Sequence, residues 1–233
     1  MKFYLGGYFL LKLQPLKFGT KIGEIVYTCS DCINDNTIND WAYSWTIDNS
    51  AETEEAKDKF CLDDNKVISI RTWIEKKQEE KKIGWKNVFT DLESAIEYKQ
   101  TFFSHFDEIK VIALYFDEDD TRNLLDDFKP QSEEFGEIGL RLTLLRQIEE
   151  NENEELLGYD LIGIELGGDF HSFHCHDIGT ELSTKFGLIL NRNGLFDDNK
   201  DWTQVLDYLN DEENGCEPVP WYVTKTKLIN INA

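Results

Sequence analysis

The segment from residue 157 to residue 176 constrains the fold of this chain most. Residues 157–166 form a strongly apolar run, Gly167 and Gly168 follow it, and residues 170–176 form a second strand-like run. Two extended runs joined by a short glycine turn predict an antiparallel hairpin. The sequence therefore predicts a sheet with antiparallel pairing in the last third of the chain.

Further strands and helices are predicted from runs of β-branched and aromatic residues and from apolar residues at helical spacing. The predicted strands are residues 3–13, 23–28, 41–47, 110–116 and 221–231. The predicted helices are residues 51–60, 67–82, 91–106, 119–128, 178–186 and 198–210. Residues 136–146 fit either state, and residues 34–40 and 149–155 are predicted polar loops. Hairpins mixed with helices indicate an α+β fold with a mostly antiparallel sheet and packed helices.

Local sequence signals predict where several helices and turns begin or end. Thr90 and Glu93 have the spacing of a capping box at a helix start, and Gly187 is placed to end the helix before it. Asn193 and Gly194 predict a tight turn. We expect residues 1–233 to form a single α+β domain, with a possible soft boundary near residues 60–66.

The charge balance limits which classes of partner the protein is expected to bind. The 233 residues include 46 acidic and 24 basic side chains, which gives a formal net charge of −22 at pH 7. Such a field repels nucleic acid and anionic membrane surfaces, and it attracts a basic protein. Hydrophobic residues make up 40% of the chain, enough to predict a packed globule rather than disorder.

The first 13 residues contain an apolar stretch, but Gly6, Gly7, Tyr8 and Lys12 interrupt it and no small-residue cleavage site follows. No segment reaches the roughly 20 apolar residues of a membrane span. Five cysteines without an export signal are most simply reduced thiols, so we expect a cytoplasmic protein.

Two groups of residues have metal-ligand chemistry. Cys29 and Cys32 have the spacing of half a zinc knuckle, and His174 and His176 share one side of a predicted strand. His171 and Cys175 lie on its other side. Nothing in the sequence brings the two groups together, so these are weak candidates, and we expect neither a metal nor another cofactor. A thioredoxin-like role for the cysteine pair is weaker, since poor helix formers follow it.

Two enzymatic alternatives stay open. Asp117, Asp119 and Thr121 match the DxDxT spacing of haloacid-dehalogenase-like phosphatases, which are Mg²⁺-dependent hydrolases, but acidic residues at a helix start explain the same pattern. Cys175 beside His171 or His174 is a conceivable nucleophile without a visible oxyanion hole. A metal-binding or structural role is a further alternative. No complete catalytic motif is present, so the prediction is that the protein is not an enzyme.

A resemblance adds to this reading. It rests on residues 156–222, with GYDLIGIE at 158–165, FHSF at 170–173, Cys175, Leu190-Asn191, GLF at 194–196 and EPVPW at 217–221. These runs resemble immunity proteins of bacterial polymorphic-toxin and contact-dependent inhibition systems. The resemblance implies an intracellular inhibitor that binds and neutralises a toxin domain, often a basic nuclease.

On this reading the partner meets an acidic surface, and three acidic runs are the candidates for it. They comprise Asp117, Glu118, Asp119, Asp120, Glu149, Glu150, Glu152, Glu154, Glu155, Asp211, Glu212 and Glu213. Each run also suits an ordinary solvated loop. The oligomeric state is left open.

Overall fold

A computed structural model describes residues 2–17, 21–44, 50–84, 88–129, 139–165, 169–176, 178–197, 201–214 and 216–231, without the side chains of Ser50 and Glu212. Its strands are β1 (Phe3–Lys12), β2 (Asp35–Asn36), β3 (Ile83–Gly84), β4 (Val88–Phe89), β5 (Ile109–Asp117), β6 (Glu155–Ile164), β7 (Phe170–Ser172) and β8 (Trp221–Ile229). Its α-helices are α1 (Ser50–Phe60), α2 (Asp64–Glu79), α3 (Leu92–Phe102), α4 (Glu118–Asp127), α5 (Gly139–Leu144), α6 (Gly179–Phe186) and α7 (Thr203–Leu209). Three 3₁₀ turns, η1 (Asp40–Ala42), η2 (Phe173–His176) and η3 (Glu212–Asn214), complete the described elements.

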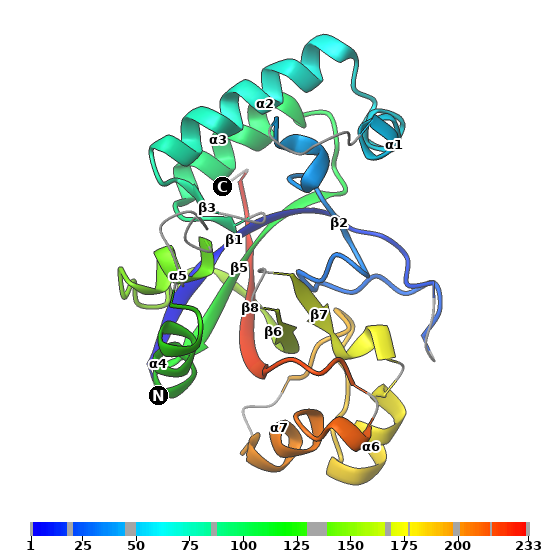
Figure 1. The fold of residues 1–233 in the computed structure, drawn as a ribbon. Coiled ribbons are helices and arrows are strands. Elements are labelled where there is room, and N and C mark those ends of the chain that lie inside the picture. Colours follow the sequence, from blue (N-terminus) through cyan, green and yellow to red (C-terminus); the bar gives the residue numbers. More distant parts are fainter. Residues whose placement is uncertain are drawn as a thin grey trace.

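The described strands form one curled sheet in the order β3-β4-β1-β5-β8-β6-β7, with β2 paired to β1. All pairings between them are antiparallel. The three long central neighbours β1, β5 and β8 come from opposite ends and the middle of the chain (Figure 1). The predicted α+β class with a mostly antiparallel sheet is confirmed.

Helices cover both faces of this sheet (Figure 1). The larger apolar cluster joins side chains of α1, α2 and α3 to those of α6 and α7 across β1, β5 and β8. A second cluster joins α4 and α5 to the opposite sides of the same strands and to β6 and β7. Burial of these two faces is the main stabilising contribution that the sequence supplies.

β5 shows how the sequence produces this two-sided core. Its residues 111–116 are all apolar or aromatic, as expected of a strand buried on both faces. Val111, Ala113 and Tyr115 belong to the larger cluster. Ile112, Leu114 and Phe116 belong to the second cluster. Successive side chains point to opposite faces of a strand, so one apolar run serves two cores.

Two glycines shift this alternation. The register of β1 against β5 slips between Leu5 and Gly7, and that of β6 against β8 slips between Leu156 and Gly158. Gly7 has φ +152° and Gly158 has φ +145°. Before its bulge, β1 sends odd-numbered Leu5 into the larger cluster, and after it, even-numbered Leu10. A bulge inserts one residue and so reverses the parity of the buried face.

Most predicted helices are present, with corrected starts. The α3 cap is Asp91, whose side chain accepts a hydrogen bond from the Ser94 backbone N–H at 2.9 Å. Thr90 is not the cap because it is fully buried and its hydroxyl donates to the Lys81 carbonyl. Gly187 ends α6 in the left-handed conformation, as predicted. The predicted helix 198–210 is reduced to α7, and residues 198–200 lie outside the described part.

Two predicted strands were wrong. Residues 23–28 form only an isolated bridge, Ile25 to Pro15, because the Tyr27 N–H donates to the Asn193 carbonyl instead of to β1. Residues 40–42 form η1, capped by the Asn39 side chain, and residues 45–49 lie outside the described residues. The loop predicted at residues 34–40 contains the short β2 and several buried side chains.

The predicted hairpin pairs as expected, with Ile162 opposite Ser172 and Ile164 opposite Phe170. Its turn at Gly167 and Gly168 lies outside the described residues. The second strand was predicted too long. It ends at Ser172, whose hydroxyl accepts a hydrogen bond from the His174 N–H, and a 3₁₀ turn follows. A local side-chain bond of this kind competes with the strand ladder.

Phe60 and Leu62 within the predicted soft boundary, and Val67 directly after it, all pack in the larger apolar cluster. The division into domains stays a prediction. None of the described helices combines the length and the apolar character that crossing a membrane requires.

Candidate functional site

The loop before β2 places Cys29 and Cys32 in different environments. The Asn34 side chain donates to the carbonyls of Val26 and Thr28, both at 2.8 Å, and the Asn34 N–H donates to the Ser30 carbonyl. These bonds fold the loop into a compact turn. Cys29 points inward and is fully buried, whereas Cys32 is exposed.

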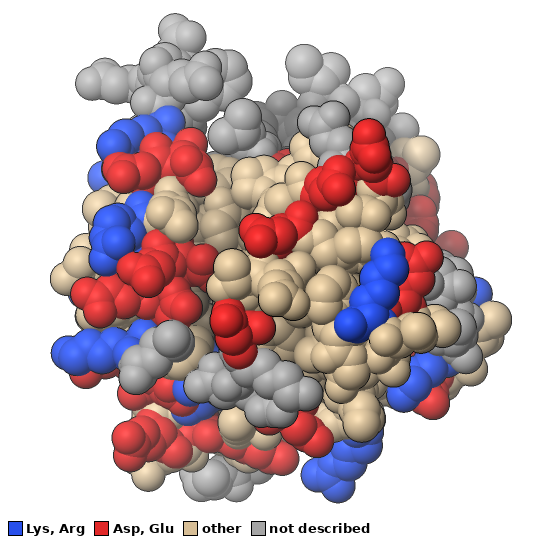
Figure 2. All heavy atoms as spheres, turned by 90° about the horizontal axis from the view of Figure 1, so that it is seen from below, with Lys and Arg blue, Asp and Glu red and all other residues tan. Residues whose placement is uncertain are grey.

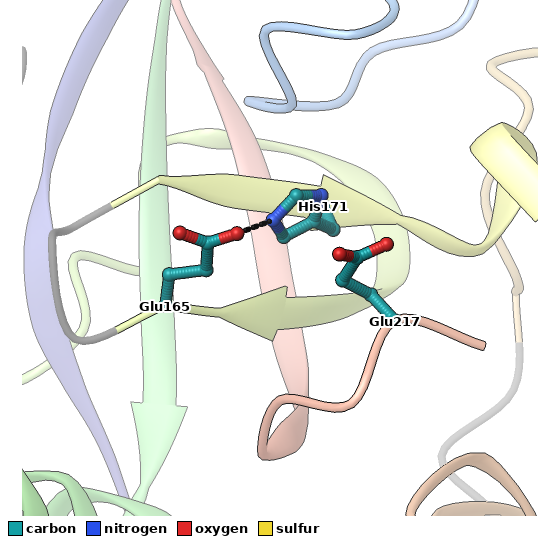
Figure 3. A group of neighbouring side chains, drawn as sticks. All are labelled: Glu165, His171 and Glu217. Atoms are coloured by element: carbon teal, nitrogen blue, oxygen red, sulfur yellow. Dashed lines mark hydrogen bonds and ion pairs between the residues drawn. The ribbon is translucent and has the colours of Figure 1, made fainter. Parts of the chain in front are cut away.

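The β6–β7 hairpin contributes a second group of polar side chains, His171 and Glu165. His171 lies on β7 opposite Gly163, so Glu165, two residues further along, is its diagonal neighbour. The His171 Nε2–H donates to Glu165 Oε1 at 2.9 Å. Figure 3 shows Glu217 reaching toward the same ring from the segment before β8, and the second ring nitrogen pointing away from Glu165.

The exposed thiol of Cys32 interacts with side chains at the end of this hairpin. It interacts with Cys175 on η2, with Ser30 of its own loop and with His171. The Ser30 Oγ lies 3.5 Å from the Cys175 Sγ. Two segments more than a hundred residues apart in the sequence, the loop around Cys32 and the η2 turn, therefore form one cluster, which we call the thiol cluster (Cys32, Cys175, Ser30, His171 and Glu165).

The two thiols differ in acidity. The hydrogen bond with Cys175, and after it those with Ser30 and His171 and the charge of His171, lower the pKa of Cys32 despite partial burial. The pKa of Cys175 is raised, first by Cys32 and then by burial. Burial raises the pKa of Cys29. The arrangement thus favours a thiolate at Cys32 and a protonated thiol at Cys175.

The predicted metal candidates are not brought to one centre. Cys29 packs in the second apolar cluster. His174 is buried and donates from Nε2 to the Gly194 carbonyl at 2.8 Å, and burial lowers its pKa. His176 packs edge-on against Trp221 with ring centroids 5.9 Å apart. The strand-face argument for the two histidines was wrong because both lie on the 3₁₀ turn.

Sequence reasoning missed two carboxylates. Glu165, His171 and Glu217 each place one oxygen or nitrogen within 4.8 Å of the others in the described part of the chain. The hairpin register could have predicted Glu165 beside His171. Glu217 carries no sequence signal, because the path of residues 216–220 depends on tertiary packing. In the present geometry the imidazole uses Nε2 for Glu165.

A hollow lies beside the thiol cluster. It encloses about 510 Å³ and Cys32 forms part of its wall. The other residues around it are Gln14, Pro15, Leu16, Lys17, Asp31, Ile33, Asp35, Glu55, Asp58 and Lys59. The Lys59 ammonium pairs with Asp35 at 2.5 Å, and both residues belong to the wall of this hollow. Small polar molecules can therefore reach the Cys32 sulfur.

A second surface carries exposed apolar side chains. Ile22 is 70% exposed, Ile189 79% and Ile25 37%. Ile189 lines a hollow of about 300 Å³ and Ile25 lines one of about 720 Å³. The two hollows share Leu190 and Lys21, the residue before Ile22, in their walls. We call Ile22, Ile25 and Ile189 the isoleucine surface. Clustered exposed apolar side chains with a polar rim are typical of protein-binding surfaces.

The first acidic run, residues 117–120, begins α4. The Asp117 side chain accepts from the Asp120 N–H at 2.8 Å and caps the helix. Burial, and then the charge of Asp117, raises the pKa of Asp120 to about 7. Asp119 is exposed and pairs with Arg122 at 3.0 Å. Capping accounts for Asp117 and the ion pair with Arg122 for Asp119, and the phosphatase alternative stays a prediction.

The second acidic run, residues 149–155, is tied to the sheet. Glu150 forms ion pairs with Lys225 at 2.6 Å and Lys227 at 2.5 Å, both on β8. Glu154 accepts a hydrogen bond from the Tyr115 hydroxyl at 2.6 Å. Glu149 pairs with Lys2, Glu155 accepts from Asn230, and Glu152 is exposed. Much of this run's charge therefore has an internal partner.

The third acidic run belongs to a larger acidic lobe, residues 178–214, which holds α6, α7 and η3. The lobe has eight acidic and three basic residues. Asp207, Asp211 and Glu213 are exposed, and the Glu212 side chain lies outside the described part. Figure 2 shows the side of the molecule that lies lowest in Figure 1. Acidic side chains are spread over much of it rather than gathered in one patch.

No protein-family model, no curated protein and no solved structure matches this chain.

Proposed function

We propose that the protein is an inhibitor of the immunity type, which binds a basic protein domain and blocks it. The observation that carries the proposal is the isoleucine surface next to an acidic lobe. Ile189 is 79% exposed and lies within that lobe. Apolar anchors beside an excess of negative charge favour a partner that carries positive charge around an apolar centre.

The charge distribution supports the acidic lobe over the other two runs. In residues 149–155 the inhibitor's own lysines, Lys225 and Lys227, engage Glu150. In residues 117–120 the side chain of Asp117 is used as a cap, and Asp120 is close to half-protonated at neutral pH. Asp207, Asp211 and Glu213 remain exposed in the lobe. Exposed charges at a rim steer a partner in and raise the association rate.

The direct test is binding to a candidate toxin domain of basic pI encoded beside this gene in the source genome. We expect a complex whose association rate falls steeply between low and physiological salt, where the Debye length shrinks to about 8 Å. Ile189→Asp should weaken binding at least about tenfold, as loss of an interface anchor does. Asp207→Lys with Asp211→Lys should slow association and leave dissociation nearly unchanged.

Ile68→Asp is the matched control, because Ile68 is 62% exposed on α2, at the far end of the molecule from α6 (Figure 1). It should bind as the unmodified protein does. Equal binding by Ile189→Asp and Ile68→Asp, or association indifferent to salt and to both lobe substitutions, would contradict the proposal.

A further inference from the structure

We propose that Cys32 and Cys175 form a peroxide-reactive dithiol, in which Cys32 is the attacking thiol and Cys175 resolves the oxidised product into a disulfide. The inference is independent of the proposed binding function. It rests on the thiol cluster, which brings together two cysteines, an imidazole and a carboxylate beside an open hollow.

Exposure and neighbours separate this pair from the remaining cysteines. Cys32 is exposed and forms part of the wall of the 510 Å³ hollow, and Cys175 lies half-buried beside it. Cys29 and Cys216 are buried, which keeps their sulfurs from solvent. Cys61 is exposed just after α1, where it provides an accessible thiol outside the thiol cluster.

His171 adds to the hydrogen bonds from Cys175 and Ser30 that favour the thiolate of Cys32. Its ring donates to Glu165 from Nε2 and also interacts with Cys32, so it bridges carboxylate and sulfur. Glu217 adds a second carboxylate near the ring (Figure 3). A positively charged imidazole beside a thiol favours the thiolate. The thiolate is the nucleophile in reactions with peroxides.

The reaction balances with a hydroperoxide as oxidant. The Cys32 thiolate attacks the terminal oxygen of the hydroperoxide, the O–O bond breaks, and the leaving alkoxide takes a proton from the His171 imidazolium. This step leaves a sulfenic acid on Cys32. The Cys175 sulfur then attacks the Cys32 sulfur, the S–O bond breaks, and the departing hydroxide leaves as water with the Cys175 proton. Two thiols and one hydroperoxide thus give one disulfide, one alcohol and one water, and an external thiol restores the reduced pair.

The test uses hydrogen peroxide on the full reduced chain, followed by alkylation and peptide mass spectrometry. We expect a Cys32–Cys175 disulfide peptide and a loss of two hydrogen atoms from the intact mass. At pH 7 Cys32 should react about tenfold faster than Cys61, since an ordinary thiol is only a few per cent thiolate at that pH while lower basicity costs some nucleophilicity.

Three variants isolate the roles. Cys175→Ser should stop at a sulfenic acid on Cys32 that a dimedone probe traps, and Cys32→Ser should abolish disulfide formation at Cys175. His171→Gln should slow the Cys32 reaction and shift its pH profile upward, a change that a merely structural role would not produce. Cys61→Ser is the control and should leave the kinetics unchanged. Equal peroxide reactivity of Cys32 and Cys61, or a Cys175→Ser protein without trapped sulfenic acid, would overturn the proposal.

Discussion

At the scale of single residues, Asp160 on β6 carries a titration that the stability of the protein should report. Its side chain is fully buried, and Oδ2 has no hydrogen-bond partner among the described residues. Burial raises its pKa to about 7, against about 3.9 for aspartate in an unfolded chain. Between these two values the folded state binds the proton and the unfolded state does not. Stability should therefore fall as the pH rises from 4 to 7.

Asp160→Asn replaces the protonated carboxyl by a neutral group of the same shape. The variant should gain up to about 4 kcal/mol over the unmodified protein above pH 7, and its stability should depend less on pH. Urea unfolding at pH 5 and pH 8 measures both effects. The exposed Asp119→Asn is the matched control and should change stability little at either pH. Equal loss of stability by Asp160→Asn at both pH values would contradict the raised pKa of Asp160.

The residue scale is also where sequence reasoning predicted least of the candidate site. The cysteines and histidines were recognised by type, but Cys32 and Cys175 meet only because the loop before β2 packs against η2. Contacts between segments so far apart depend on the whole sheet, and no local period encodes them. The one predictable contact was Glu165 with His171, which follows from the hairpin register.

At the scale of elements, the bulge at Gly158 sets which side chains of β6 enter which apolar cluster: Leu157 before it lies in the second cluster and Tyr159 after it in the larger one. A Cβ at this position would lie 2.7 Å from the Leu195 Cβ and 2.9 Å from the Phe196 carbonyl oxygen, and φ is +145°. Gly158→Ala should therefore destabilise the protein by about 2–4 kcal/mol. Gly179→Ala is the matched control, because its Cβ would meet Phe173 at an ordinary 3.8 Å inside α6. It should be neutral or slightly stabilising. The midpoints of urea unfolding measure both effects. Equal midpoints for the two variants would contradict the role given to the bulge.

The strands also show how far the positions of elements could be predicted from the sequence. Long runs such as residues 110–116 and 221–231 were predicted well because both faces of β5 and β8 are largely buried. Residues 23–28 have strand-like composition and yet form no strand, since Asn193 takes the backbone bond of Tyr27 that a strand would need. Composition sets what a segment can do, and competing tertiary partners decide what it does.

At the scale of the whole molecule, a net charge of −22 should make the folded state sensitive to salt. Compaction brings like charges together, and this repulsion opposes folding. Added NaCl shortens the Debye length from about 30 Å at 0.01 M to about 10 Å at 0.1 M, so we expect the thermal midpoint to rise over that range. Exposed pairs such as Asp119 with Arg122 lose little, because exposed ion pairs contribute at most about 1 kcal/mol.

Glu150 provides a comparison within the same protein, because its two lysine partners are largely buried. It lies between Lys225 and Lys227, whose side chains are 12% and 3% exposed, so salt screens this group poorly. Glu150→Gln should lower the midpoint at every salt concentration and leave its slope with salt unchanged. A midpoint that falls with salt would show that local ion pairs outweigh the net repulsion.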